Sequence, residues 1–270
     1  LCGWCKSRGY PDGREGCGFS PSTRKRYLAA LRFLYLHFQV EEDLPDINPT
    51  SMVPAPKRVN KIGFTPTRQE VKRLFDAPAQ PKARLLIRWA FYAPSRANTF
   101  AKALWRDIDL DRGKWEVVGK GDKVDVFDLC PALIRELRQY RKWQLKEAER
   151  NGAMVDALSD PDTAFVLLTR RGNAMSKTQI YKCLRRLGVR AGVGVRRAPS
   201  HWDSVGGLTS NVTPHAMRRA WAASALNDEK QPIDVVSEVL KHSEISTTRR
   251  HYAPTKSSRA REALLSMTVA

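Results

Sequence analysis

A segment rich in proline and glycine, residues 48–66, most strongly constrains how this chain of 270 residues can fold. Its backbone-restricting residues are Pro49, Pro54, Pro56 and Gly63. Proline favours extended backbone in the residue before it, so a helix of ordinary length does not cross this segment. We therefore expect two parts, residues 1–50 and 67–270, joined by an extended linker at residues 51–66. The sequence after the linker contains no second linker and no internal repeat.

The linker also carries part of a large positive charge. The chain has 47 Lys and Arg against 28 Asp and Glu, which gives a formal charge of +19 and a pI near 10.1. Such a surface attracts polyanions, above all nucleic acids, although a merely basic soluble protein would share this balance. We expect phosphate contacts from six basic residues near the N-terminus: Arg24, Lys25, Arg26, Lys57, Arg58 and Lys61.

The apolar segments are too short for a membrane helix, which needs about 20 apolar residues. The richest of them, residues 85–93, is interrupted by Arg88. The start of the chain has no pattern of a signal peptide, so a cytoplasmic location without membrane contact is expected.

The N-terminal part contains one clear helical pattern. Ser22 is placed to cap a helix whose apolar residues recur at helical spacing: Tyr27, Leu28, Leu31, Tyr35 and Phe38. One helix cannot bury its apolar face alone, so we expect the end of a small helical domain. Residues 1–20 are irregular and contain three cysteines: Cys2, Cys5 and Cys17. They include a CxxC pair, which is half of a zinc site if another ligand joins; the alternative is that the three are reduced thiols without a metal.

The long C-terminal part is predicted to be mainly α with a small β-sheet, an α+β fold. Thr67 and Glu70 have the spacing of a capping box that begins a helix. Apolar residues alternate on both sides of a glycine-rich turn at residues 119–122, which predicts a β-hairpin: Trp115, Val117, Val124 and Val126. Further helices are predicted at residues 82–92, 131–150, 176–187, 214–226 and 233–240. The basic loop at residues 192–212 has no pattern that predicts its structure.

Four separate segments contain residues suited to phosphoryl transfer. They hold, in order, Arg96, then Lys120, then His215 with Arg218, and finally His242 with Tyr252. Taken singly, each has an ordinary explanation as a solvated charge, a pair on one helix face or a packed tyrosine. Taken together and in this order, they supply the groups that cleavage of a phosphodiester requires.

The chemistry of these groups is complementary. Two guanidinium groups can donate paired N–H groups to phosphoryl oxygens and stabilise the charge of the transition state. A lysine can protonate the departing oxygen, and a histidine can exchange a proton near neutral pH. A tyrosine hydroxyl, with an ordinary pKa of about 10, becomes a nucleophile when such neighbours activate it. The sequence has no pattern like the carboxylate cluster of a two-metal nuclease.

On these residues the chain resembles the tyrosine recombinases, the phage integrase family, over roughly residues 20–265. The resemblance places the catalytic residues of the family on Arg96, Lys120, His215, Arg218, His242 and Tyr252. It implies that Tyr252 attacks DNA to leave a 3′-phosphotyrosine and a free 5′ hydroxyl, with Lys120 as the general acid. Lys123 in the same hairpin is expected to contact DNA and is the competitor for the role of acid. No metal or nucleotide cofactor is implied.

The resemblance also implies a domain arrangement and partners. Residues 1–50 match the end of a helical core-binding domain whose first helices are missing, and residues 67–270 match a catalytic domain with a tail at 253–270. The expected partners are double-stranded DNA and further copies of the chain, as a homotetramer on paired DNA sites. The tail has a short apolar stripe that docks on a neighbouring protomer or packs on its own domain: Ala260, Leu264, Leu265 and Met267.

Three positions depart from the family pattern. Residues 93–95 (Ala-Pro-Ser) replace the usual Thr-Gly-aliphatic turn before Arg96, Thr99 replaces a common acidic residue, and Lys241 replaces the glycine before His242. None of these changes removes a catalytic group, but Lys241 adds a charge near the site. The predicted function is a site-specific recombinase. The alternatives are a type IB topoisomerase-like enzyme and a DNA-binding regulator that has lost catalysis.

Overall fold

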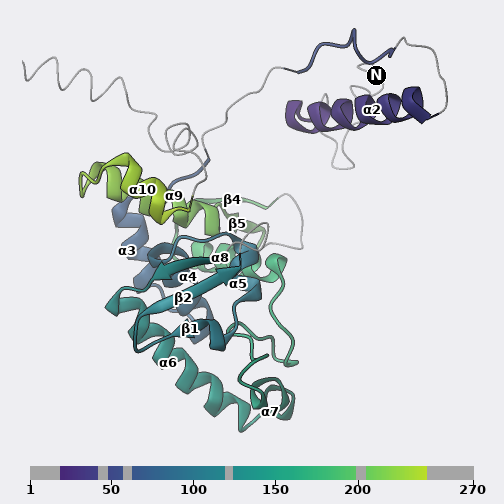
Figure 1. Ribbon diagram of the computed structural model, residues 1–270. Coiled ribbons are helices and arrows are strands. Elements are labelled where there is room, and N and C mark those ends of the chain that lie inside the picture. Colours follow the sequence, from purple (N-terminus) through teal and green to yellow (C-terminus); the bar gives the residue numbers. More distant parts are fainter. Residues whose placement is uncertain (1–18, 42–47, 57–62, 119–123, 199–204, 242–270) are drawn as a thin grey trace, which may run out of the picture. The chain divides into compact units, whose positions relative to one another are not determined.

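The computed structural model describes residues 19–41, 48–56, 63–118, 124–198 and 205–241, which Figure 1 draws as coloured ribbon. The chain divides into two compact units, Leu1–Ile62 and Gly63–Ala270. Among the helices within these described stretches, none is long and apolar enough to cross a membrane.

The described helix of the first unit is α2 (Pro21–Glu41). The hydroxyl of Ser20 accepts the backbone N–H of Thr23 at 3.2 Å, so Ser20 caps this helix. The prediction that Ser22 is the cap is therefore wrong by two residues, because Ser22 already lies inside the first turn.

Only part of the expected apolar face of α2 is covered within the first unit. Leu28 is buried, whereas its neighbour Tyr27 is 55% exposed. Arg32 donates to the backbone carbonyls of Thr50 and Val53 at 3.3 and 2.9 Å and so holds a turn against the helix. A single helix has too few neighbours to bury the rest of its apolar residues.

The second unit is built around helix α4 (Pro81–Tyr92), which packs most extensively on α6 (Pro131–Ala148), α8 (Lys177–Arg190) and α9 (Pro214–Asn227). Four side chains in the middle of α4 are fully buried: Leu85, Leu86, Ile87 and Trp89. The helix before it, α3 (Arg68–Asp76), begins with the predicted capping box, in which Thr67 and Glu70 each bind the other's backbone N–H. All these helices lie where the apolar periodicity predicted them.

A three-stranded antiparallel sheet covers one side of this helical core (Figure 1). Its strands are β1 (Ile108–Asp109), β2 (Lys114–Val118) and β3 (Val124–Asp128). Val118 pairs with Val124, so β2 and β3 flank residues 119–123 and confirm the predicted hairpin. Trp115 and Phe127 face the core with ring centroids 5.4 Å apart, and Trp115 lies 4.8 Å from Trp89 of α4. The hairpin is thus anchored on α4 through aromatic contacts.

Several short elements were not predicted. They are α5 (Ala97–Lys102), η1 (Trp105–Asp107), the strand β1, α7 (Gly152–Ser159) and a two-stranded sheet of β4 (Val195–Arg197) with β5 (Leu208–Ser210). The last of these stands in the basic loop for which no structure was predicted. Each of these elements contains too few apolar repeats for periodicity to reveal it. The final described helix, α10 (Ile233–Val239), was predicted, and the mainly helical α+β class is confirmed.

Candidate active site

Arg218 joins three of the segments that the sequence grouped together. It lies on α9, one turn after the cap residue Thr213, whose hydroxyl accepts the N–H of Ala216 at 3.1 Å. Arg218 is 3% exposed, and its guanidinium donates to the backbone carbonyls of Pro94 and Leu240. Pro94 belongs to the turn after α4, and Leu240 ends α10. One buried cation therefore holds the ends of α4 and α10 against the first turns of α9.

Arg96 follows the same turn after α4. The turn is buried, with Ala93 1% and Ser95 3% exposed, while Arg96 itself is exposed. Arg96 is the cap residue of α5 and its carbonyl accepts the N–H of Thr99 at 3.0 Å. The backbone at Arg96 is therefore fixed by α5 and by the core, and its guanidinium remains accessible to a ligand.

His215 lies on α9 one turn before Arg219 and shares a helix face with Arg218. Its side chain keeps an exposed edge, but crowding by the surrounding protein removes part of its hydration. This desolvation lowers the pKa of His215, and the positive charges of Arg218, Arg219 and Arg96 lower it further. The imidazole is therefore neutral at neutral pH, with one ring nitrogen able to accept a proton. Arg96 and Arg218 therefore both lie close enough to His215 to influence its charge.

The sequence reasoning missed Arg219. Its guanidinium donates two hydrogen bonds to the carbonyl of Phe64, at 3.1 and 2.7 Å. A Cβ atom on Gly63 would lie 2.7 Å from this guanidinium, so any other residue at that position would push the guanidinium aside. Arg219 thus ties the start of the second unit to the helix that carries His215 and Arg218.

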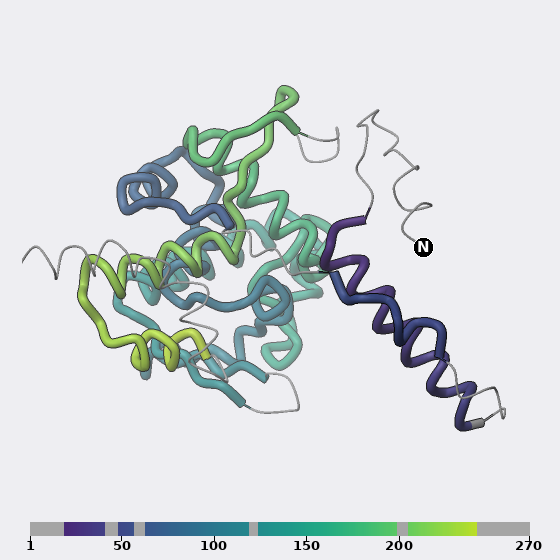
Figure 2. The backbone as a smooth tube through the Cα atoms, turned by 90° about the horizontal axis from the view of Figure 1, so that it is seen from above, coloured from purple at the N-terminus to yellow at the C-terminus, as the bar shows by residue number. Residues whose placement is uncertain are grey.

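Lys241 lies at the end of α10, directly after the carbonyl that Arg218 binds. Its backbone has a left-handed conformation with φ of 49°, and its ammonium lies 5.9 Å from the ring centroid of Phe127 on β3. Figure 2 shows the end of α10 beside the two strands that flank residues 119–123. Lys241, which replaces the glycine of the family pattern, therefore lies where α10, the sheet and Arg218 come together.

The structure brings together Arg96, His215 and Arg218 of the six predicted catalytic residues. The other three, Lys120, His242 and Tyr252, lie outside the described residues, as do Lys123, the linker cations Lys57, Arg58 and Lys61, and the cysteines Cys2, Cys5 and Cys17. In the first unit, Arg24 is half-buried on α2, and Lys25 and Arg26 are exposed. The roles of all these residues stay predictions.

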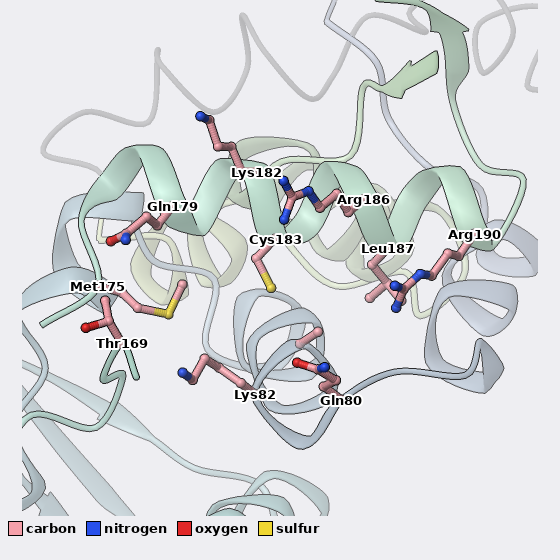
Figure 3. Close-up of a pocket in the computed structure, with 11 residues that line it drawn as sticks. Gln80, Lys82, Thr169, Met175, Gln179, Lys182, Cys183, Arg186, Leu187 and Arg190 are labelled. Atoms are coloured by element: carbon pink, nitrogen blue, oxygen red, sulfur yellow. The ribbon is translucent and has the colours of Figure 1, made fainter. Parts of the chain in front are cut away.

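A second group of cations lines a cavity of about 370 Å³ between the first turn of α4 and α8 (Figure 3). Its basic lining residues are Lys82, Lys182, Arg186 and Arg190, and none of the described residues that line it is a carboxylate. Burial lowers the pKa of Lys82, whose ammonium donates to the carbonyl of Leu168. Arg96 follows the opposite end of α4, about 18 Å away for a helix of this length. The cavity therefore adds positive charge to the second unit without belonging to the arginine site.

Comparison with known proteins finds related sequences. A sequence model described as the phage integrase family matches residues 66–259. The tyrosine recombinase XerC of Xanthomonas axonopodis pv. citri (strain 306) is 27% identical over 236 residues, which cover 86% of this chain and 67% of that protein. The tyrosine recombinase XerA of Thermococcus kodakarensis is 27% identical over 238 residues, covering 86% of this chain and 71% of that protein.

Solved structures share the fold. A XerH site-specific recombinase bound to a palindromic difH substrate in a post-cleavage complex has a TM-score of 0.67 at 20% identity, covering 91% of this chain and 67% of that one. A crystal structure of XerA recombinase has a TM-score of 0.59 at 19% identity, covering 97% of this chain and 86% of that one.

Proposed function

The chain belongs to the phage integrase family, and from this premise we propose that it cleaves and rejoins DNA at specific sites through a phosphotyrosine at Tyr252. The observation that carries the proposal is the family match over residues 66–259, which spans all six predicted catalytic residues in their expected order. The contacts of Arg218 support it, because they hold the segment just before Arg96 and the segment just before His242 against one turn of α9.

Side chains of this chain supply the nucleophile, the proton donor and the proton acceptor of the proposed reaction. The Tyr252 oxygen bonds to phosphorus while the bond from phosphorus to the 5′ oxygen breaks, and Lys120 gives that oxygen a proton. The tyrosyl proton passes to a neighbouring base, for which the neutral imidazole of His215 is suited. Arg96 and Arg218 stabilise the charge on the non-bridging oxygens. Attack by the 5′ hydroxyl of a second strand then reverses these steps and releases Tyr252.

The test of the nucleophile uses a nicked duplex that traps the covalent product. Tyr252→Phe removes one oxygen and should abolish the covalent protein–DNA band while leaving DNA affinity within about twofold of the parent. A covalent band formed by the Phe variant would refute the assignment. Binding without any band from the parent would identify the chain as a regulator, and relaxation of supercoiled DNA without pairing of sites would identify a topoisomerase.

We also propose that the tail of one copy docks on another to build a tetramer on paired DNA. A groove of about 790 Å³ between α3, the end of α4 and the second half of α9 supports this, since part of its lining is apolar: Val71, Phe75, Phe91, Tyr92 and Ala223. Its remaining lining includes charged side chains: Arg68, Lys72, Asp76, Asp228 and Glu229. The apolar stripe at residues 260–267 is the proposed occupant of this groove.

We also propose that this DNA-associated protein is located in the cytoplasm.

Deletion of residues 260–270 tests the tail. The truncated chain should still bind a single site but should no longer form a tetramer, as measured by the mass of the complex in solution. Phe75→Ser in the groove should have the same effect. A tetramer that persists in both variants would refute the docking, and a truncated chain with a lowered Tm in its monomeric state would show that the tail packs on its own domain.

A further inference from the structure

Lys241 has a backbone conformation that favours glycine. Its φ of 49° is left-handed, and its N–H donates to the carbonyl of Glu238 at 2.8 Å, which ends α10. Glycine is usual at such a helix end because the Cβ atom of any other residue crowds the neighbouring carbonyl. In the part of the chain that the structure describes, the one other non-glycine residue with positive φ is Lys230, at 54° in the exposed loop before α10. A side chain persists in this conformation where its surroundings hold it there.

The side chain of Lys241 has a defined contact. Its ammonium lies over the ring of Phe127, 5.9 Å from the centroid, within the range of a cation–π interaction. Phe127 is 7% exposed and is itself packed on Trp115, which in turn lies against Trp89 of α4. The ammonium therefore rests on a ring that the core of the second unit already fixes.

This contact connects two parts of the proposed active site. On one side, Lys241 follows Leu240, whose carbonyl accepts from the buried guanidinium of Arg218, and it precedes His242 in the sequence. On the other side, Phe127 is on β3, three residues after Val124, which pairs with Val118 across residues 119–123. A glycine at position 241 would relieve the backbone but would leave these two segments without this link.

We propose that Lys241 is a positioning residue that braces the β2–β3 hairpin against the end of α10. The link sets how the hairpin strands lie relative to Arg218, and it acts through the ring of Phe127. This inference rests on the proposed function only for its effect on the rate of cleavage, because the brace itself exists without DNA. The competing possibility is that the ammonium of Lys241 contacts a DNA phosphate directly.

Lys241→Gly and Lys230→Gly form a matched pair, since each replaces a lysine of the same left-handed conformation. Lys230→Gly should raise Tm by about 2 °C through relief of the backbone and should cleave a nicked duplex at the parental rate. Lys241→Gly should gain less in Tm, because it loses the contact with Phe127. It should slow single-turnover cleavage by about 3- to 5-fold, as expected for one cation–π contact. Lys241→Arg keeps a cation over the ring and should stay within about twofold of the parent.

Amide hydrogen exchange gives a measurement that needs neither DNA nor activity. In Lys241→Gly the amides of residues 124–128 should exchange about 3-fold faster than in the parent, while Lys230→Gly leaves them unchanged. Unchanged exchange in Lys241→Gly would overturn the brace. If the parent forms no covalent product, the proposed function fails, and this exchange result still decides the role of Lys241.

A double-mutant cycle separates the brace from direct contact with DNA. In a Phe127→Leu background the ring is absent, so Lys241→Gly should slow cleavage no further. An equal loss of rate in both backgrounds would show that the ammonium acts on DNA and would overturn the proposal. Cleavage by Lys241→Gly at the parental rate would overturn it as well.

Discussion

Arg218→Ala should reduce the stability of the fold as well as the rate of cleavage. The guanidinium is 3% exposed and donates to the carbonyls of Pro94 and Leu240, which belong to segments distant in the sequence. Alanine would leave both carbonyls without this donor in a buried place. The variant therefore loosens the ends of α4 and α10 together, independently of any DNA.

The magnitude follows from these two contacts. A hydrogen bond from a charged donor contributes about 1.5–3 kcal/mol, and the alanine variant no longer bears the cost of burying a charge. We expect the free energy of unfolding to fall by about 2–4 kcal/mol, or Tm by about 5–15 °C for a unit of this size. Lysine at this position has one ammonium for two carbonyls and should recover part of this loss at most.

Urea denaturation without DNA measures the effect, with Arg96→Ala as the matched control. Arg96 is exposed, so its alanine variant should unfold within about 0.5 kcal/mol of the parent. Both variants should slow single-turnover cleavage at least about 100-fold at a temperature where both are folded. The free energy of unfolding therefore distinguishes Arg218→Ala from Arg96→Ala, whereas the cleavage rate does not.

The outcome that contradicts this reasoning is specific. If Arg218→Ala unfolds at the same urea concentration as Arg96→Ala, the two carbonyl contacts do not hold the segments together. If Arg218→Ala is unstable but cleaves at the parental rate when folded, Arg218 is a structural residue and the catalytic role is wrong.

Three further predictions concern the general acid, the linker and His215. Lys120→Ala should cleave normal DNA slowly and recover on a substrate with a 5′-bridging sulfur, whose leaving group scarcely needs a proton; selective recovery by Lys123→Ala instead would exchange the two roles. Neutralising Lys57, Arg58 and Lys61 should flatten the dependence of log affinity on log salt by up to about three units, near 0.9 per phosphate contact, without changing base preference. An unchanged slope would remove the linker from the DNA contacts. The pKa of His215 is lower in the folded state than in the unfolded state, so protonation opposes folding. The parent should therefore lose stability relative to His215→Gln as pH falls below about 6.5, the ordinary pKa of histidine. This loss should stop once pH is below the pKa of His215 in the folded state. Parallel pH profiles of the two proteins would refute the shift.

Local signals in the sequence were enough to place the main elements of the second unit. The capping box of Thr67 and Glu70 marks the start of α3, and alternating apolar residues around a glycine-rich turn mark the β2–β3 hairpin. These signals work because a cap or a strand face involves residues close in the chain. The cap of α2 was misplaced because Ser20 and Ser22 have the same side chain and only the backbone conformation distinguishes them.

The sequence by itself determined the order of the helices and the hairpin, the positive charge and the family. Only the tertiary structure decided what the charged side chains near the site contact: Arg218 binds two carbonyls 124 and 22 residues away, Arg219 binds the carbonyl of Phe64, and Lys241 lies over Phe127. The physical reason is that a guanidinium or an ammonium accepts any well-placed carbonyl, ring or phosphate as a partner. The type of a charged residue therefore determines which kinds of group it can bind, and the packing of distant segments determines which of those groups it contacts.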